Sequence, residues 1–209
     1  MKYTLRPTNV TDRDAITTLY KKVIRISGGL ARREEEVTSE YVEGFIEKAK
    51  GLQFVATDGT HIVGEIHCYK PGIQCFDHLL GDLTIAVDPD YQGKGVGKAL
   101  FMAILSEVKE NRKDILRIEL LTGEANKRAI AFYQSLGFVI EGRMPNRYRL
   151  GSADLAQVGL PPAPGTFDAA STSGTFDATP TSGTLGTTPT PPSFDADIPM
   201  AWMNPNFAQ

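Results

Sequence analysis

Residues 1–150 carry two hydrophobic periodicities in alternation. Apolar side chains recur at helical spacing in four segments, and short apolar or alternating runs typical of strands lie between these segments. The pair Asp58-Gly59 separates two of the strand-like runs and predicts a hairpin turn. The predicted helices lie at about 12–27, 39–50, 97–109 and 126–136, and the predicted strands at 3–6, 53–57, 62–68, 82–87 and 116–121.

Residues 138–150 are predicted to be extended and to contribute two further strands. The resulting order, β-α-α-β-β-β-α-β-α-β-β, mixes hairpin-like and crossover connections. Such an order is typical of an α+β or mixed α/β sandwich built around one sheet.

The composition changes abruptly near residue 150. Residues 1–150 hold all 22 Lys and Arg and 20 of the 25 acidic residues, which gives a formal charge of +2. Residues 151–209 contain no Lys, Arg or Glu, but nine of the 13 prolines. A segment rich in Pro, Thr, Ser and Gly buries too little apolar area to offset its loss of backbone entropy, so we expect most of it to be disordered.

This second part also contains a nonapeptide repeat, with frames that begin at residues 165, 174, 183 and 192. Calcium-binding β-helices need paired glycines and an Asp in every turn, whereas here the glycines are single and one copy lacks its Asp. We therefore interpret the repeat as an expanded loop, after which an apolar stretch rejoins the domain. The expected organisation is a domain at 1–150, a low-complexity repeat loop at 151–193 and the final strand of the same domain at 194–204.

Overall composition excludes several classes of function. The net charge of −3 gives no basic field for nucleic acid, and no run approaches the ~18 apolar residues of a membrane span. The N-terminus lacks the apolar core of a signal peptide. Cys68 and Cys75 are too few for a disulfide framework or a zinc site, so no metal is predicted. These observations predict a soluble, cytoplasmic protein.

The segment between the predicted strand 82–87 and the predicted helix 97–109 is rich in glycine. Glycines allow tight turns, and backbone amides at a helix N-terminus favour phosphate. Gly93, Gly95 and Gly97 are spaced two apart, which fits neither a dinucleotide fingerprint nor a Walker loop. Lys94 and Lys98 add positive charge. From this pattern alone, a phosphate site and a simple tight turn both stay open.

A second block, Asn126–Phe138, places Asn126, Ala129 and Tyr133 on adjacent turns of one helix. Together with Gln92-x-x-Gly95-x-Gly97, this block resembles the GNAT superfamily of acetyl-CoA-dependent N-acetyltransferases. The resemblance covers residues 2–150 and the final strand. Around the second block the chain looks most like the branch that acetylates amino acids and other small amines.

The resemblance implies the GNAT acyl-CoA N-acyltransferase fold of the α/β (α+β) class. In this fold a mixed central sheet is flanked by helices, and the last strand commonly inserts between the two preceding strands. The resemblance also implies acetyl-CoA as cosubstrate, in a slot where the strand ending at Val87 splays away from the next. The implied cofactor-binding residues are Ile85, Ala86, Val87, Gln92, Gly93, Lys94, Gly95, Val96, Gly97, Lys98, Asn126 and Ala129.

The resemblance also gives Tyr133 the role of the tyrosine that protonates the departing thiolate. The residues themselves leave the general base open. Asp82 begins the strand that ends at the cofactor and shares a face with Thr84 and Ala86, so we take it as the candidate. Glu65 and Glu119 are strand carboxylates that can act through water, and for all three the alternative is a solvated or paired carboxylate.

The charged run Arg32–Glu36 lies where this family builds its acceptor site. One interpretation is that it selects a zwitterion, with Arg for the carboxylate and Glu for the amine. The other is a solvated charged surface.

The resulting prediction is an acyltransferase that moves acetyl from acetyl-CoA to a primary amine of a small molecule, by direct attack in a ternary complex. The first alternative is a protein N-terminal or lysine acetyltransferase. The second is a non-catalytic CoA-binding regulatory module, and the third assigns the function to the repeat segment. Homodimers are common in the family, and the sequence leaves the oligomeric state open.

Overall fold

A computed structural model of the protein describes residues 3–26, 30–149 and 194–207. The predicted repeat loop at 151–193 lies outside these described residues. The helices are α1 (Arg13–Ile24), α2 (Ser39–Ala49), α3 (Val96–Asn111) and α4 (Lys127–Ser135). The strands are β1 (Thr4–Pro7), β2 (Gln53–Thr57), β3 (Ile62–Tyr69), β4 (Leu79–Val87), β5 (Arg117–Gly123), β6 (Val139–Ile140), β7 (Met144–Arg149) and β8 (Phe194–Met203).

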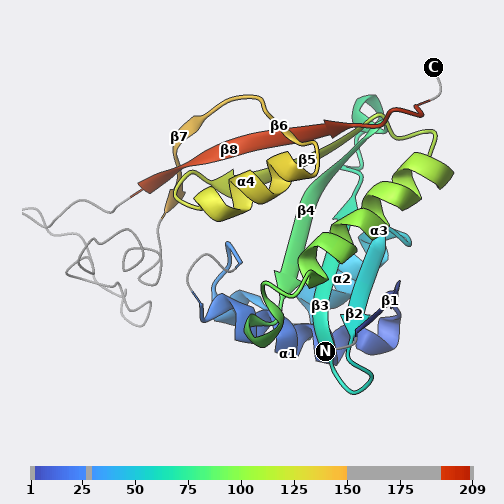
Figure 1. Ribbon diagram of the computed structural model, residues 1–209, viewed down its shortest axis with the longest axis vertical. Helices are drawn as coiled ribbons and strands as arrows, with labels where there is room; N and C mark the ends of the chain where they lie inside the picture. The colour runs from blue at the N-terminus through green and yellow to red at the C-terminus, as the bar shows by residue number, and fades with distance from the viewer. Residues whose placement is uncertain (1–2, 27–29, 150–193, 208–209) are drawn as a thin grey trace, which may run out of the picture.

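The predicted mixed sheet flanked by helices is confirmed. Strands β1 to β4 form an antiparallel series, β4 and β5 run parallel, and β8 runs antiparallel to β5. β8 lies inside the sheet, with β5 on one side and both β6 and β7 on the other (Figure 1). Strand β4 starts three residues earlier than predicted, because the buried Leu79 and Leu80 extend it into the core.

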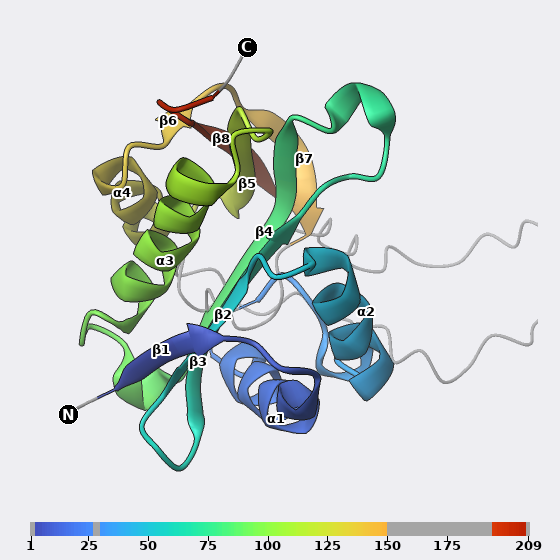
Figure 2. The same ribbon diagram turned by 90° about the vertical axis from the view of Figure 1, so that its right-hand side faces the viewer.

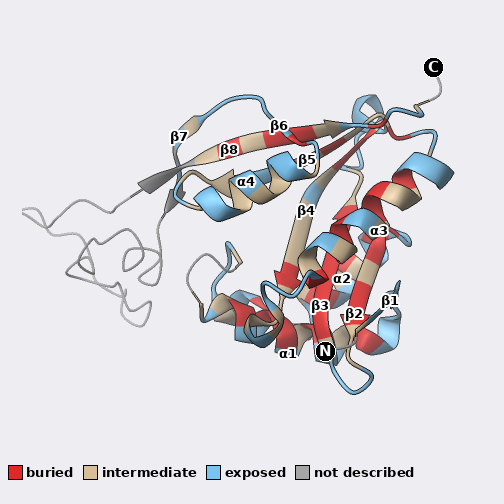
Figure 3. Ribbon diagram, in the orientation of Figure 1, coloured by how far each residue is buried: buried red, intermediate tan, exposed pale blue. Residues whose placement is uncertain are grey.

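Helices cover both faces of the sheet. Figure 2 shows α3 and α4 on one side, and α1 and α2 on the other. Each side has its own apolar cluster: Leu100 and Ile104 of α3 pack with Ile66 of β3, while Ile16 of α1 packs with Phe45 of α2. Burial is greatest in β2, β3 and the sheet-facing side of α3 (Figure 3). Among the described residues, no helix combines the length and apolarity needed to cross a membrane.

The end of β8 is fixed to the connection between α3 and β5. The buried Asn204 donates from its side-chain amide to the carbonyl of Ile115 at 2.8 Å, and from its backbone amide to the carbonyl of Leu116 at 2.7 Å. Buried polar groups are stabilising only when they are hydrogen-bonded, and both bonds here satisfy that condition. A residue remote in the sequence therefore completes the C-terminal half of the sheet.

Gly64 in β3 lets the first turn of α3 approach the sheet. A Cβ at this position would lie 2.9 Å from both Val96 Cγ1 and Leu100 Cδ1. Because Val96 begins α3, this contact sets how closely the helix N-terminus sits against β3.

We expect Gly64→Ala to lower the free energy of unfolding by about 1–3 kcal/mol, since it overpacks this contact. Gly44→Ala in α2 is the matched control: a Cβ there meets nothing within 4 Å, and Ala is the better helix former by about 1 kcal/mol. Denaturant unfolding of the two variants should therefore give shifts of opposite sign. Shifts of the same sign would show that the close approach does not constrain α3.

Candidate active site

Strands β4 and β5 are paired only where they begin. Leu79 pairs with Arg117 and Leu80 with Ile118, and beyond these two pairs the strands diverge (Figure 1). From Asp82 onward the β5-facing edge of β4 has no strand partner among the described residues. The predicted cofactor-arm residues Ile85, Ala86 and Val87 lie on this unpaired stretch. An extended ligand can add to such an edge through main-chain hydrogen bonds.

A β-bulge lies where β4 leaves β5. Thr84 pairs with His67 but Gly81 pairs with Tyr69, so β4 carries one more residue than β3 between these pairs. Asp82 takes up the irregularity with a φ of 48°, and the Thr84 hydroxyl donates to the Asp82 carbonyl at 3.2 Å. Bulges increase local twist and redirect side chains. This one accompanies the divergence of the two strands.

The glycine-rich segment after β4 is held by contacts from two other parts of the chain. Lys22 of α1 binds Asp88 at 2.7 Å and Asp90 at 2.8 Å. The Tyr91 hydroxyl donates to Asp58 in the β2–β3 turn at 2.6 Å. This bond, with two backbone amides, lowers the pKa of Asp58 to about 2. The loop is therefore anchored before its glycines begin.

The glycines then turn the backbone into α3. Gly93 and Gly95 have φ values of 71° and 82°, in the left-handed region that favours glycine. Gly95 caps α3 without a side chain, and the amides of Val96, Gly97 and Lys98 have no acceptor among the described residues. Free amides at a helix N-terminus carry about half a positive charge and attract anions. The predicted phosphate-binding residues Gln92–Lys98 thus form one continuous turn that leads into the first turn of α3.

Helix α4 carries the second predicted block. The Asn126 side chain caps the helix by accepting from the Ala129 amide at 3.1 Å. This bond uses the side-chain oxygen and leaves the side-chain NH₂ available as a donor. Tyr133 lies one turn beyond Ala129, in an aromatic cluster with Phe101 and Phe138.

The Tyr133 hydroxyl is a proton donor over the whole physiological range. Burial among the aromatic rings raises the pKa of Tyr133 to about 12, and the residue is partly buried rather than sealed. Neither a hydrogen bond nor a nearby charge from the described residues contributes to this shift.

Of the three candidate carboxylates, Asp82 is the exposed one without an ion pair in the described part of the chain. Asp82 lies close enough to Tyr69 for its charge to act on the Tyr69 hydroxyl. Burial, followed by the charge of Asp82, raises the pKa of Tyr69 to about 12. Asp82 is thus presented at the surface by the bulge, near a tyrosine that stays protonated.

Glu65 is fully buried beneath α1 and α2 and is occupied by other groups. Its carboxylate accepts from the Tyr20 hydroxyl, from Gln53 Nε2 at 2.9 Å and from His67 Nδ1 at 3.1 Å. A carboxylate with three donors satisfies the requirement for burial of charge. This geometry favours a structural role for Glu65.

Glu119 also has a partner. Arg117 Nε binds its carboxylate at 2.5 Å, and the same guanidinium binds Glu141. The two carboxylates raise the pKa of Arg117. Glu119 is therefore part of a surface ion-pair group.

Most of the charged run between α1 and α2 pairs within itself or with α1. Glu34 binds Arg25 at 2.6 Å, and the Arg33 backbone amide donates to Glu36 at 2.7 Å. Arg32 differs, because its guanidinium carbon lies 4.3 Å from the centre of the Tyr41 ring. Burial raises the pKa of Tyr41, and the nearby charge of Arg32 opposes this shift. Of the two arginines in this run, Arg32 thus lies against a side chain of α2, whereas Arg33 lies near Glu35.

Two tyrosines missed by sequence reasoning connect Arg32 with Asp82. Arg32 lies over the Tyr41 ring, and the charges of both Arg32 and Asp82 act on the pKa of Tyr41 and on that of Tyr69. A signal was present in the sequence: His67, in the predicted strand 62–68, and Tyr69, directly after it, alternate with Ile66 and Cys68. Tyr41 gave no such signal, because on a helix it reads as an ordinary apolar position.

No cluster of His, Cys, Asp and Glu suited to a metal ion occurs within residues 3–26, 30–149 and 194–207. Arg32, Asp82 and the tyrosines instead provide hydrogen-bonding groups of both charges.

Comparison with known proteins supports this description. Residues 49–140 match the family model for the acetyltransferase (GNAT) domain. The chain is 29% identical over 138 residues to the uncharacterized N-acetyltransferase MJ1207 of Methanocaldococcus jannaschii. The aligned region covers 65% of this chain and 60% of that protein.

Two further relatives match over shorter stretches. The [ribosomal protein bS18]-alanine N-acetyltransferase of Escherichia coli K12 is 44% identical over 55 residues, 26% of this chain and 36% of that protein. The L-amino acid N-acyltransferase MnaT of the same organism is 32% identical over 62 residues, which make up 30% of this chain and 35% of that protein. The chain thus spans less than two thirds of the length of these relatives.

Solved structures match over nearly the whole chain. The GNAT-family acetyltransferase of Streptococcus pneumoniae has a TM-score of 0.71 at 16% identity and covers 97% of this chain and 99% of its own. The yncA protein of Salmonella typhimurium, solved with its cofactor acetyl-CoA, has a TM-score of 0.69 at 16% identity, with coverages of 100% and 98%. At these identities the likeness shows the fold.

The raised pKa of Tyr133 makes stability depend on pH in the alkaline range. The unfolded state loses the phenolic proton near pH 10 and the folded state only near 12, so stability falls as pH rises from about 10 to 12. We expect Tyr133→Phe to flatten this fall, because the substitution removes one of the protons released on unfolding. Free energies of unfolding measured between pH 8 and 11.5 test this, and equal slopes in both proteins would contradict the burial of the hydroxyl.

Proposed function

We propose that the chain is an N-acetyltransferase of the GNAT superfamily, a class of acyltransferases, and that it moves acetyl from acetyl-CoA to the primary amine of a small molecule. One observation carries the proposal: β4 and β5 separate after two residue pairs, next to a helix N-terminus whose first amides have no backbone acceptor among the described residues. An elongated molecule with a phosphate at one end and a peptide-like arm fits this arrangement.

Acetyl-CoA fits the groups present. The amides of Gly93–Lys98 and the charges of Lys94 and Lys98 suit its pyrophosphate, and Gln92 begins the bend. The unpaired edge formed by Ile85, Ala86 and Val87 suits the amides of its pantetheine arm. The free NH₂ of Asn126, with the small Ala129 beside it, faces the arm from α4 in this proposal.

The bound acetyl-CoA supplies a thioester, whose carbonyl carbon bonds to the amine nitrogen as the carbon–sulfur bond breaks. Asp82 takes the proton that the ammonium group must lose before its lone pair is available. Its exposure and freedom from ion pairs among the described residues support this role. Positioned general bases of this kind contribute about 10²–10⁴-fold to rate.

Tyr133 gives its phenolic proton to the thiolate and regains one from solvent. A pKa of about 12 keeps the hydroxyl protonated until that step. No side chain bonds covalently to the acetyl group in this scheme, so both substrates are bound together. Because no covalent enzyme intermediate forms, the scheme needs only a general base, Asp82, and a general acid, Tyr133.

Arg32 supports a small zwitterionic acceptor. It lies over the Tyr41 ring, and its charge and that of Asp82 both act on Tyr41 and Tyr69. A free amino acid presents the complementary charges, with its carboxylate toward Arg32 and its ammonium toward Asp82. Charge-assisted hydrogen bonds between guanidinium and carboxylate are strong and directional.

A protein N-terminus is the second candidate acceptor. The 44% identity with the bS18-alanine acetyltransferase over 55 residues favours it. A peptide acceptor has an amide where a free amino acid has its carboxylate, so Arg32 distinguishes the two cases. The third candidate function is that of a non-catalytic module that binds CoA.

Replacement of Gly95 tests the cofactor site. We expect Gly95→Asp to weaken acetyl-CoA binding at least tenfold in calorimetric titration, because it adds a carboxylate where the phosphates would lie. Gly59→Asp is the control, since it imposes a similar positive φ (98° against 82°) and the same charge at the β2–β3 turn. Equal affinity in the two variants would refute the phosphate-loop assignment.

Acceptor specificity tests the transferase itself. We expect thiol release from acetyl-CoA with free amino acids, and a lower rate with their amides at equal concentration. Arg32→Gln should raise the KM for an amino acid by about tenfold and leave the KM for its amide unchanged, because only the former offers a carboxylate. Arg33→Gln is the control, as this neighbour lies 3.9 Å from Glu35.

Other outcomes separate the alternatives. Turnover with peptides only would identify a protein acetyltransferase. No thiol release with any amine, while acetyl-CoA binding is measured in the same sample, would leave the non-catalytic module.

A further inference from the structure

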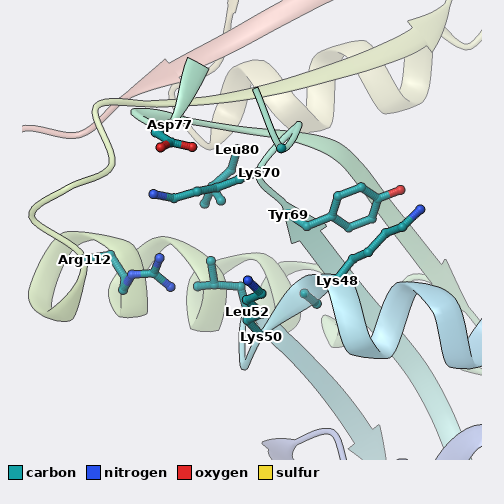
Figure 4. Close-up of a pocket in the computed structure, with 10 residues that line it drawn as sticks. Lys48, Lys50, Leu52, Tyr69, Lys70, Asp77, Leu80 and Arg112 are labelled. Atoms are coloured by element: carbon teal, nitrogen blue, oxygen red, sulfur yellow. The ribbon is translucent and has the colours of Figure 1, made fainter. Parts of the chain in front are cut away.

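A cavity of about 280 Å³ lies at the other end of α3 from the glycine-rich loop (Figure 4). It is formed where α2 and α3 end, where β3 ends and where β4 begins. Its charged lining consists of Lys48, Lys50, Lys70, Arg112 and one carboxylate, Asp77.

The positive charge of this lining is only partly compensated. Asp114, just outside the lining, binds Lys70 at 3.0 Å and Arg112 at 3.2 Å. Lys48 and Lys50 form no ion pair with any residue that the structure describes. Four cations thus converge on one concavity against two carboxylates, and such a surface focuses a positive potential.

Helix dipoles explain only part of this arrangement. Lys48 lies in the last turn of α2, where a cation interacts favourably with the helix C-terminus. Lys70 follows the end of a strand and gains nothing from a dipole. Lys50 has a φ of 46°, a left-handed conformation in which glycine or asparagine is common. The favourable interaction of cations with a helix C-terminus therefore does not explain why all four cations lie around this cavity.

The floor of the cavity is apolar. Leu52 is 3% exposed, Leu80 is fully buried, and the Tyr69 ring completes the wall. Figure 4 shows the leucine side chains between Arg112 and Lys70 on one side and Lys48 and Tyr69 on the other. A ligand seated here meets carbon below and cations around its edge.

We propose that this cavity binds a small organic anion, a molecule with carboxylate or phosphate groups on a short carbon skeleton. The cations hold the anionic oxygens, and the leucines contact the carbon part.

This site is separate from the proposed pyrophosphate site. The glycine-rich loop precedes the first residue of α3, and Arg112 follows its last. A helix of 16 residues is about 24 Å long, so the two regions lie at opposite ends of that distance.

The cavity also touches the proposed catalytic group through one residue. Tyr69 lines the cavity, the charge of Asp82 acts on its hydroxyl, and Lys48 lies 5.5 Å from the centre of its ring. A bound anion attracts Lys48 and so acts on Tyr69, which lies near Asp82. The anion can be a separate effector or an anionic group of the acceptor itself, and binding does not require the transferase activity.

The test is calorimetric titration of the full chain with citrate and inorganic phosphate, with glycerol as the uncharged probe. We expect saturable citrate binding, weakened about tenfold in Lys48→Gln/Lys50→Asn, because two charges about 5 Å from the ligand are lost. Asparagine suits the left-handed position of Lys50. Asp77→Asn should instead tighten binding severalfold, since it removes the carboxylate of the lining.

Lys109→Gln/Lys113→Gln is the matched control, because it removes two cations near the same end of α3 that do not line the cavity. Its citrate affinity should stay within about twofold of wild type. Absence of saturable binding, or equal affinity in the two double variants, would overturn the proposal. Acetyl-transfer assays with citrate present then separate the sources: competition with the amine indicates the acceptor's own anion, and a change in kcat alone indicates an effector.

Discussion

The early end of pairing between β4 and β5 is the constraint on which the candidate site depends. The strands share only two residue pairs, and the bulge at Asp82 then adds a residue and extra twist to β4. Continued pairing to Val87 would satisfy the edge of β4 within the sheet and leave nothing to bind a ligand. The divergence instead exposes that edge beside the first turn of α3. Asp82 itself lies at the origin of the divergence.

The two faces of the sheet contribute differently to this arrangement. On the α3 side the contacts are apolar, and Gly64 allows the helix N-terminus to lie against β3. On the α1 and α2 side, β3 carries the polar series Glu65, His67 and Tyr69. Glu65 is satisfied by three donors, and Phe45 stacks on His67 with ring centres 4.0 Å apart. This packed series supports Tyr69, which stacks on His67 and whose hydroxyl lies within reach of the charge of Asp82.

Helix α3 connects two regions that attract anions for different physical reasons. At its N-terminus the attraction comes from backbone amides, which exist in any helix but are left free here by a glycine cap. Beyond its C-terminus the backbone is electronegative, and the attraction comes from side-chain cations that outnumber the nearby carboxylates. The first depends on local chain geometry, whereas the second requires residues from α2, β3 and the segment after α3.

Local patterns in the sequence determined the helices, most strands and the two motifs of the GNAT resemblance, because side-chain periodicity and glycine turns act within a few residues. The carboxylates could not be ranked in this way. Asp82, Glu65 and Glu119 look alike along the chain, and only tertiary structure buries Glu65, pairs Glu119 and exposes Asp82. The grouping of Arg32 with Tyr41 and Tyr69, and the convergence of cations at the end of α3, also required the fold. Strand pairing and helix packing bring together residues that are far apart in sequence, and no local pattern encodes those distances.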